Sequence, residues 1–125
     1  MKKLSETEFE IMKILWEEDK PLTSNDILNR LQGTIDWKLA SLMTALARMA
    51  EKGYVYCDRS TRTNYYSAVI LRETYQMNES TAFLEKLYDK SATKLVASLY
   101  QGGKLSKEEI LKLREYLNSM DKGGN

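Results

Sequence analysis

The 125-residue sequence contains no histidine, one cysteine, one proline and no long apolar run. The absence of histidine removes the most common general base and the most common metal ligand. The lone cysteine, Cys57, can form neither an internal disulfide nor a thiolate cage around a metal. We interpret Cys57 as a small apolar residue of a strand, with a regulatory thiol as the alternative. The composition therefore predicts no metal site.

Signals for catalysis and for membrane insertion are also missing. The chain has no glycine-rich phosphate loop and no paired-carboxylate site, so we predict that it is not an enzyme and needs no cofactor. The opening segment, MKKLSETEFEIMKILW, lacks the apolar core of a signal peptide, and no apolar run approaches the ~18 residues of a membrane span. Low cysteine content is typical of a reducing compartment, so we expect a cytoplasmic protein.

Charge is nearly balanced overall but is unevenly distributed. The net charge is +1. Residues 1–37 carry five basic and eight acidic side chains, whereas residues 38–70 carry five basic and two acidic ones. A local basic face matters more to a phosphate backbone than the total charge does. The second stretch is therefore a candidate for contact with nucleic acid.

The segment at residues 37–53, WKLASLMTALARMAEKG, is predicted to form the helix around which the chain is organised. Leu39, Leu42, Leu46, Met49 and Ala50 recur at spacings of three and four, as on a buried helix face. The opposite face consists of Ala40, Thr44, Ala47, Arg48 and Glu51, with Ser41 beside it, and its front half is small and uncharged. Such short side chains suit a helix that lies in the DNA major groove. The alternative is an ordinary core helix of a small helical domain.

Two shorter helices are predicted before this segment. Ser5 and Glu8 form a capping-box pattern at the start of a helix over about residues 5–18. Pro21 interrupts the helical pattern, and Thr23 or Ser24 caps a second helix. A turn at residues 32–34 joins the second and third helices, which is a helix-turn-helix layout.

After residue 53 the apolar period changes to two, which predicts a β-hairpin. The strands are expected at residues 54–59 and 64–70, joined by a polar turn at 60–63. The tip carries Arg59 and Arg62 and no carboxylate between residues 59 and 64. It is either a solvated hairpin tip or a wing that grips phosphates beside the groove. Together with the helices, it predicts a winged helix-turn-helix at residues 1–70.

Three further helices are expected at residues 74–89, 91–100 and 106–120, with a frayed tail at 121–125. About 50 residues are too few to bury their apolar side chains in a private core. These helices must pack either on the first domain or on a second copy, and we expect a homodimer. The predicted fold is therefore mainly α with a small β-hairpin, and residues 71–125 form the dimerisation region. The expected interface residues are Phe83, Leu84, Leu87, Tyr88, Leu95, Leu99, Leu113 and Leu117.

Four segments in order resemble the penicillinase-repressor family of winged-helix transcription regulators, the BlaI/MecI/CopY group. They are SETEFEIMKILWEEDKPLTSNDILNRL, WKLASLMTALARMAEKGYVYCDR, TNYYSAVI, and FLEKLYDKSATKLVASLY followed by LSKEEILKLREYL. The resemblance implies a homodimeric repressor of a palindromic operator, for an antibiotic-resistance or stress-response operon. The positions that it assigns to the recognition helix and wing are Trp37, Lys38, Ser41, Thr44, Arg48, Arg59 and Arg62.

By chemistry, we expect Ser41 and Thr44 to contact base edges or nearby phosphates. Lys38, Arg59 and Arg62 are expected to contact phosphates. Arg48 is a further phosphate contact, or alternatively pairs with a carboxylate of the first helix.

Three departures from the family pattern bear on its regulation. Met43 stands where several members carry Lys or Arg. The Asn-Phe bond cleaved in antibiotic-responsive members aligns with Ser98-Leu99, and the Cys-x-Cys motifs of copper-responsive members are absent. An upstream sensor or protease stays open as a partner, and the inducing signal is undetermined. The alternative function is a winged-helix module for protein contact without specific DNA binding, which the small net charge would favour.

Overall fold

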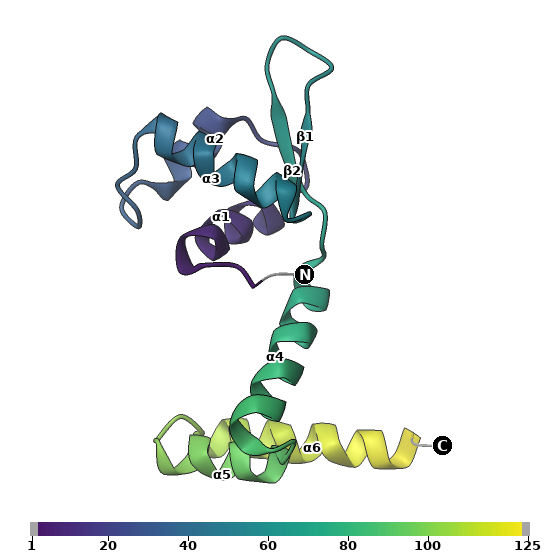
Figure 1. Cartoon of the computed structure of the whole chain (residues 1–125). Helices are drawn as coiled ribbons and strands as arrows, with labels where there is room; N and C mark the ends of the chain where they lie inside the picture. The colour runs from purple at the N-terminus through teal and green to yellow at the C-terminus, as the bar shows by residue number, and fades with distance from the viewer. Residues whose placement is uncertain (1–2, 124–125) are drawn as a thin grey trace. The chain divides into compact units, whose positions relative to one another are not determined.

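The computed structural model describes residues 3–123 and divides the chain into two compact units, Met1–Gln76 and Met77–Asn125. The first unit contains α1 (Glu6–Glu17), α2 (Ser24–Leu31), α3 (Leu39–Glu51), β1 (Val55–Asp58) and β2 (Tyr65–Ala68). Helix α4 (Arg72–Tyr88) begins in the first unit, and α5 (Ala92–Gln101) and α6 (Lys107–Gly123) follow in the second (Figure 1). The predicted winged helix-turn-helix and the three later helices are confirmed.

Capping by side chains sets the starts of α1 and α2. The Ser5 hydroxyl accepts a hydrogen bond from the Glu8 backbone N–H at 3.2 Å, and the Ser5 N–H donates to the Glu8 carboxylate at 2.9 Å. Thr23 and Asp26 form the same reciprocal pair at the start of α2. Each box satisfies backbone donors that lack a partner within the helix. The predicted capping box at Ser5 is confirmed.

Helix α3 is shorter than predicted and its buried stripe is narrower. It begins at Leu39, so residues 37 and 38 precede it. Leu42, Leu46 and Met49 are fully buried as expected, but Leu39 is 40% exposed and Ala50 is also exposed. At 100° per residue, the buried stripe is centred on residues 42, 45, 46 and 49, and residues 39 and 50 lie at its edge. The prediction was wrong for these two residues and missed Ala45, which is buried.

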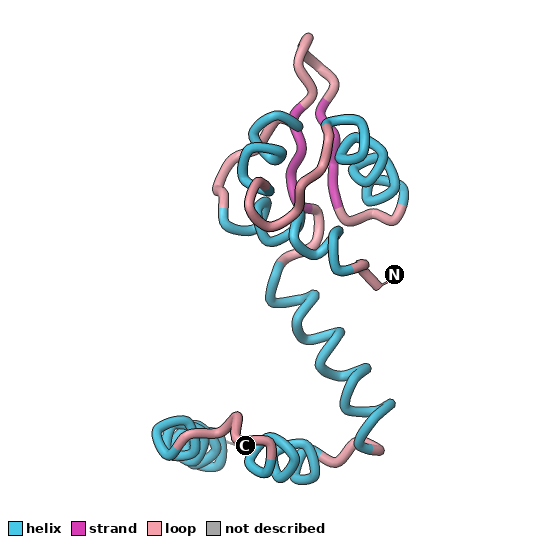
Figure 2. The backbone as a smooth tube through the Cα atoms, turned by 90° about the vertical axis from the view of Figure 1, so that its left-hand side faces the viewer, coloured by secondary structure: helices cyan, strands magenta, loops and turns pink. Residues whose placement is uncertain are grey.

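The hairpin follows α3 through a left-handed glycine. Gly53 has φ +86°, and the next N–H, that of Tyr54, donates to Met49 O at 2.9 Å, which ends the helix. Strands β1 and β2 pair antiparallel, with Tyr56 opposite Ser67 and Cys57 opposite Tyr66. Both strands are shorter than predicted, so the connecting loop is longer and extends beyond them (Figure 2).

The later helices also differ at their ends from the expectation. Helix α4 begins at Arg72 rather than 74, and Tyr75 is buried in the first unit. Ser91 and Ser106 accept backbone N–H bonds at the starts of α5 and α6, at 3.2 and 3.1 Å. The expected tail is wrong at residues 121–123, which continue α6, and residues 124–125 lie outside the described part.

Candidate nucleic-acid interface

The exposed side of α3 carries the residues assigned to the recognition helix. Lys38 is the N-cap residue of α3, and Ser41, Thr44 and Arg48 follow at spacings of three, three and four. All four side chains are exposed, and so are the intervening Ala40 and Ala47. Residues at these spacings share one helix side, so α3 presents a strip of hydroxyls and alanines with a cation near each end.

The Thr44 hydroxyl already donates a hydrogen bond within the helix. Its Oγ1 donates to Ala40 O at 3.1 Å. A threonine hydroxyl has one hydrogen and two lone pairs, so this bond leaves Thr44 as an acceptor. In the major groove, acceptors pair with the exocyclic amino groups of adenine and cytosine.

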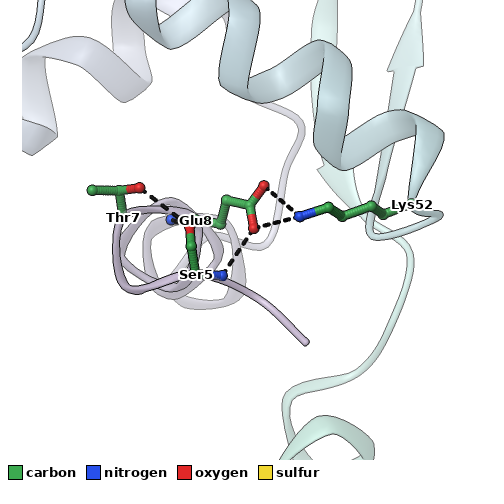
Figure 3. Close-up of polar contacts among 4 residues, drawn as sticks. All are labelled: Ser5, Thr7, Glu8 and Lys52. Carbon is green, nitrogen blue, oxygen red and sulfur yellow. Dashed lines mark hydrogen bonds and ion pairs between the residues drawn. The ribbon is translucent and has the colours of Figure 1, made fainter. Parts of the chain in front are cut away.

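Arg48 is not held by α1. The buried carboxylate of α1, Glu8, is instead bound by Lys52, whose Nζ lies 2.8 and 2.9 Å from the two carboxylate oxygens (Figure 3). Among residues 3–123, no ion pair joins Arg48 to a carboxylate. In this structure Arg48 is exposed, and the alternative pairing with an α1 carboxylate is not formed among the described residues.

The Glu8–Lys52 pair removes one of the basic side chains of residues 38–70 from those available to contact DNA. Burial opposes ionisation of Glu8, but the hydrogen bonds from Lys52 and Ser5 and the charge of Lys52 together lower the pKa of Glu8 below its ordinary value. The charge of Lys52 is therefore balanced by the Glu8 carboxylate, and we do not count Lys52 among the cations available to a phosphate backbone. This pair could not be predicted from the sequence, because its members are 44 residues apart and no periodicity relates them.

Trp37 lies outside α3 and is half-buried against the hydrophobic core. It borders a surface cavity of about 320 Å³ beside the exposed strip of α3. The hydroxyls in its lining come from α3, from the first turn of α1 and from the Ser5 cap, which the sequence analysis had not assigned to the interface. The cavity is lined by Ser5, Thr7, Glu8, Trp37, Ser41, Thr44, Ala45 and Arg48.

The hairpin tip places Arg59 and Arg62 on an exposed loop. The nearest carboxylate in sequence, Asp58, accepts the Ser60 N–H at 2.9 Å, and the hydrogen bonds from Ser60 lower the pKa of Asp58. Throughout the described chain, neither arginine is ion-paired with a carboxylate. The tip therefore presents two exposed guanidinium groups, as a phosphate-contacting wing would.

The base of the hairpin is tied to the segment before α2. Leu22 and Tyr66 exchange two backbone hydrogen bonds, at 2.9 and 2.7 Å. Burial and the neighbouring Cys57 thiol raise the pKa of Tyr66, which keeps this phenol neutral. Cys57 is a free, half-buried thiol on β1, as expected for a strand residue. The Leu22–Tyr66 pair attaches the hairpin to the segment that leads into α2.

The second unit leaves its apolar residues accessible. No residue from 77 to 122 is buried. Of the eight residues predicted at a dimer interface, four are exposed and four are half-buried. The exposed ones are Phe83, Leu87, Leu99 and Leu117, at 49, 60, 38 and 53%. The half-buried ones are Leu84, Tyr88, Leu95 and Leu113.

Residues 3–123 contain no group of three or more acidic, cysteine or histidine residues that could hold a metal ion. They also contain no helix with the length and apolar character needed to cross a membrane.

Comparison with known proteins decides the family. The family model for the penicillinase repressor matches residues 4–119. The chain belongs to the penicillinase repressor family. Its members are DNA-binding transcriptional repressors, and the four matching segments in the sequence are thereby explained.

Two relatives and one solved structure agree with this assignment. The methicillin resistance regulatory protein MecI of Staphylococcus aureus (strain N315) is 27% identical over 92% of this chain and 93% of its own length. The penicillinase repressor of Bacillus licheniformis is 28% identical over 91% of this chain and 88% of its own. The solution structure of the DNA binding domain of the repressor BlaI, 28% identical, superposes with a TM-score of 0.50, covering 58% of this chain and 90% of that domain.

Proposed function

We propose that this penicillinase repressor family member is a homodimeric, sequence-specific repressor that binds a palindromic operator. Helix α3 would enter the major groove, and the β1–β2 hairpin would grip the adjacent backbone. The observation that carries this proposal is the exposed strip of α3, where short side chains and hydroxyls are combined with an Arg48 that no carboxylate neutralises.

The proposed roles follow from the chemistry of each side chain. Ser41 and Thr44 would contact base edges, with Thr44 acting as an acceptor because its hydrogen is engaged by Ala40. Lys38 and Arg48, near the two ends of the strip, would contact phosphates. Arg59 and Arg62 on the wing would do the same.

The relatives support DNA as the ligand. Two of them are described as a methicillin resistance regulatory protein and a penicillinase repressor, and the superposed structure is described as the DNA binding domain of a repressor. That domain superposes on 58% of the present chain. Because of this similarity, we also propose that the protein controls a resistance or stress-response operon.

The homodimer is supported by the second unit. Its helices expose Phe83, Leu87 and Leu117 and bury no side chain among residues 77–122. Association with a second copy would cover this surface and place two α3 helices on a two-fold symmetric site.

Release from the operator is proposed not to depend on cleavage at Ser98-Leu99. This pair lies inside α5, whereas proteases prefer exposed loop tips. An upstream sensor would then act by another route.

A fluorescence-anisotropy titration would test the proposal. The probes are the inverted repeat nearest upstream of the gene for this protein and a scrambled duplex, each at two salt concentrations. We expect tight binding that prefers the repeat and weakens steeply with salt, because phosphate contacts release counterions. Equal, weak binding to both would favour the alternative, a module for protein contact.

Base reading by Thr44 can be tested with the same assay. Thr44→Ala should reorder the affinities for operator variants, because it removes an acceptor from the groove. Thr44→Ser keeps the hydroxyl and is the matched control. A uniform loss of affinity with an unchanged ranking would show that Thr44 does not read a base.

A further inference from the structure

Two large apolar side chains are exposed on α3. Leu39 and Met43 are 40 and 39% exposed. They are four residues apart, so they lie one turn apart on the same side of the helix. Among residues 3–76, no helix other than α3 exposes a large apolar side chain. We call Leu39 and Met43 the apolar pair.

The apolar pair borders the exposed strip of hydroxyls and alanines. At about 100° per residue, Met43 lies next to Ala47 and Ala40 around the helix, and Ser41 and Arg48 lie beyond them on the other flank. The exposed side of α3 therefore changes from apolar to polar and basic around the helix. The apolar pair is continuous with the candidate interface and is not an isolated surface feature.

The apolar pair also lies at the end of α3 that would enter the groove. The helix begins at Leu39, so the pair occupies its first two turns. In helix-turn-helix proteins, the N-terminal residues of the recognition helix contact base edges. The position of the pair is therefore suited to contact with bases.

The chemistry of the apolar pair selects one feature of the major groove. A leucine side chain has no hydrogen-bonding group, and the methionine thioether is only a weak acceptor. Thymine is the one base that presents an apolar group in the major groove, its C5-methyl. Methionine is unbranched and polarisable, so it can adapt its shape to such a methyl group.

We propose that Leu39 and Met43 read thymine methyl groups in the operator half-site. This proposal rests on the proposed function, because it requires α3 in the major groove, but it needs only one α3 on one half-site. The half-site would carry thymine opposite the apolar pair, and an adenine or cytosine amino group opposite the Thr44 acceptor.

Deoxyuridine in place of thymidine tests the proposal with a change of one methyl group. The substitution leaves every hydrogen-bonding group of the base in place. The probes are a palindrome selected from a random duplex library with the wild-type full-length chain, its half-site duplex, and a scrambled duplex. Each thymine of the half-site is replaced in turn, and in the palindrome it is replaced at both symmetric positions.

For the wild type, we expect loss of the methyl group to weaken half-site binding by about threefold to fivefold at one or two positions. In Met43→Ala and in Leu39→Ala, the penalty should disappear at the position that the truncated side chain contacts. A penalty caused by DNA shape alone would persist in both variants. Because each variant is compared with itself on the two duplexes, a uniform loss of affinity cancels.

Two further variants serve as controls. Met43→Leu keeps an apolar side chain and should keep a methyl penalty. Val69→Ala truncates an apolar side chain of the first unit that lies outside α3 and is 57% exposed. It should show the same penalties as the wild type.

Two results would overturn the proposal and leave the proposed function intact, provided that the wild type prefers the palindrome to the scrambled duplex. One is a wild type that deoxyuridine never weakens, or a selected half-site without thymine. The other is a penalty that stays unchanged in both Met43→Ala and Leu39→Ala. If the wild type bound the selected and scrambled duplexes equally, the proposed function would fail, and this proposal with it.

Discussion

The two units of the chain differ in how completely they bury their apolar side chains. Among residues 3–122, every buried hydrophobic residue lies between Leu4 and Tyr75, and several, including Ile11 and Leu46, are completely inaccessible. In the second unit, residues of the same kinds, such as Phe83 and Leu117, are about half exposed. The first unit thus has a hydrophobic core of its own, and the exposed apolar side chains of the second unit are what our proposal of a homodimer would cover.

The exposed side of α3 and the exposed apolar side chains of the later helices lie in different units of the chain. The first unit can hold α3 and the hairpin rigidly because α1, α2 and Tyr75 fill the space behind them. The helices of the second unit bury none of their apolar side chains completely among residues 77–122. Perturbations of the two units should therefore affect different measurements, and the following predictions proceed from the largest expected effect to the smallest.

Leu46→Ala should have the largest effect, because Leu46 is fully buried in α3. Loss of a buried leucine side chain is expected to lower the free energy of unfolding of the first unit by about 2–5 kcal/mol. Denaturant titration followed by tryptophan fluorescence measures it, since both tryptophans lie in this unit. Leu117→Ala is the control and should leave this transition in place. A loss below about 1 kcal/mol for Leu46→Ala would contradict the described core.

Leu117→Asp should dissociate the proposed dimer without unfolding the first unit. A charge placed in an apolar interface must lose its hydration, so we expect the dimer dissociation constant to rise by about tenfold or more. Sedimentation velocity over a concentration series measures this change. Asn118→Asp introduces the same charge at the neighbouring exposed residue of α6 and should leave the dimer intact. An unaltered dimer in Leu117→Asp would place the interface elsewhere.

Arg62→Ala should weaken binding to all duplexes alike, with no effect on dimerisation. Loss of one phosphate contact in each protomer should reduce the slope of log affinity against log salt by about 0.9 on a half-site duplex and by about 1.8 on the full palindrome. Anisotropy titrations at several salt concentrations measure the slope. Lys104→Ala removes a cation from the second unit and should not change it. Selective loss on one operator sequence would instead indicate that Arg62 reads bases.

Glu8→Gln should reveal a small, pH-dependent contribution of the Glu8–Lys52 ion pair to the free energy of unfolding of the first unit. Because Lys52 and Ser5 lower the folded-state pKa of Glu8, the unfolded chain binds the proton more readily. The stabilisation is therefore present above the ordinary glutamate pKa, about 4.3, and is lost as the pH falls through the lower folded value.

At pH 7 we expect Glu8→Gln to lower the free energy of unfolding by on the order of 1 kcal/mol relative to wild type, and this difference should shrink as the pH falls through the lowered folded-state pKa of Glu8. Glu10→Gln removes a carboxylate from the less buried i,i+3 pair Glu10–Lys13 of the same helix and should cost less. A difference between wild type and Glu8→Gln that did not vary with pH would contradict the ion pair with Lys52.

Local patterns allowed much of the fold to be predicted. The Ser5–Glu8 capping box, the glycine that ends α3 and the change of period after residue 53 are short-range features, and each is found in the structure. The predicted ends and buried faces of the helices and strands were less accurate. Leu39, for example, fits the helical spacing but lies at the edge of the buried stripe, and spacing alone does not say where that stripe is centred.

For the candidate site, the sequence determined which side chains occupy the exposed side of α3 and the hairpin tip, because helical and strand periods depend only on local order. Tertiary structure decided their electrostatic state. Lys52 is bound to Glu8 while Arg48 is left exposed, and Tyr75 meets aromatic residues from α1 and from the end of α3. These outcomes depend on contacts between residues far apart in the chain, which exist only once the helices have packed.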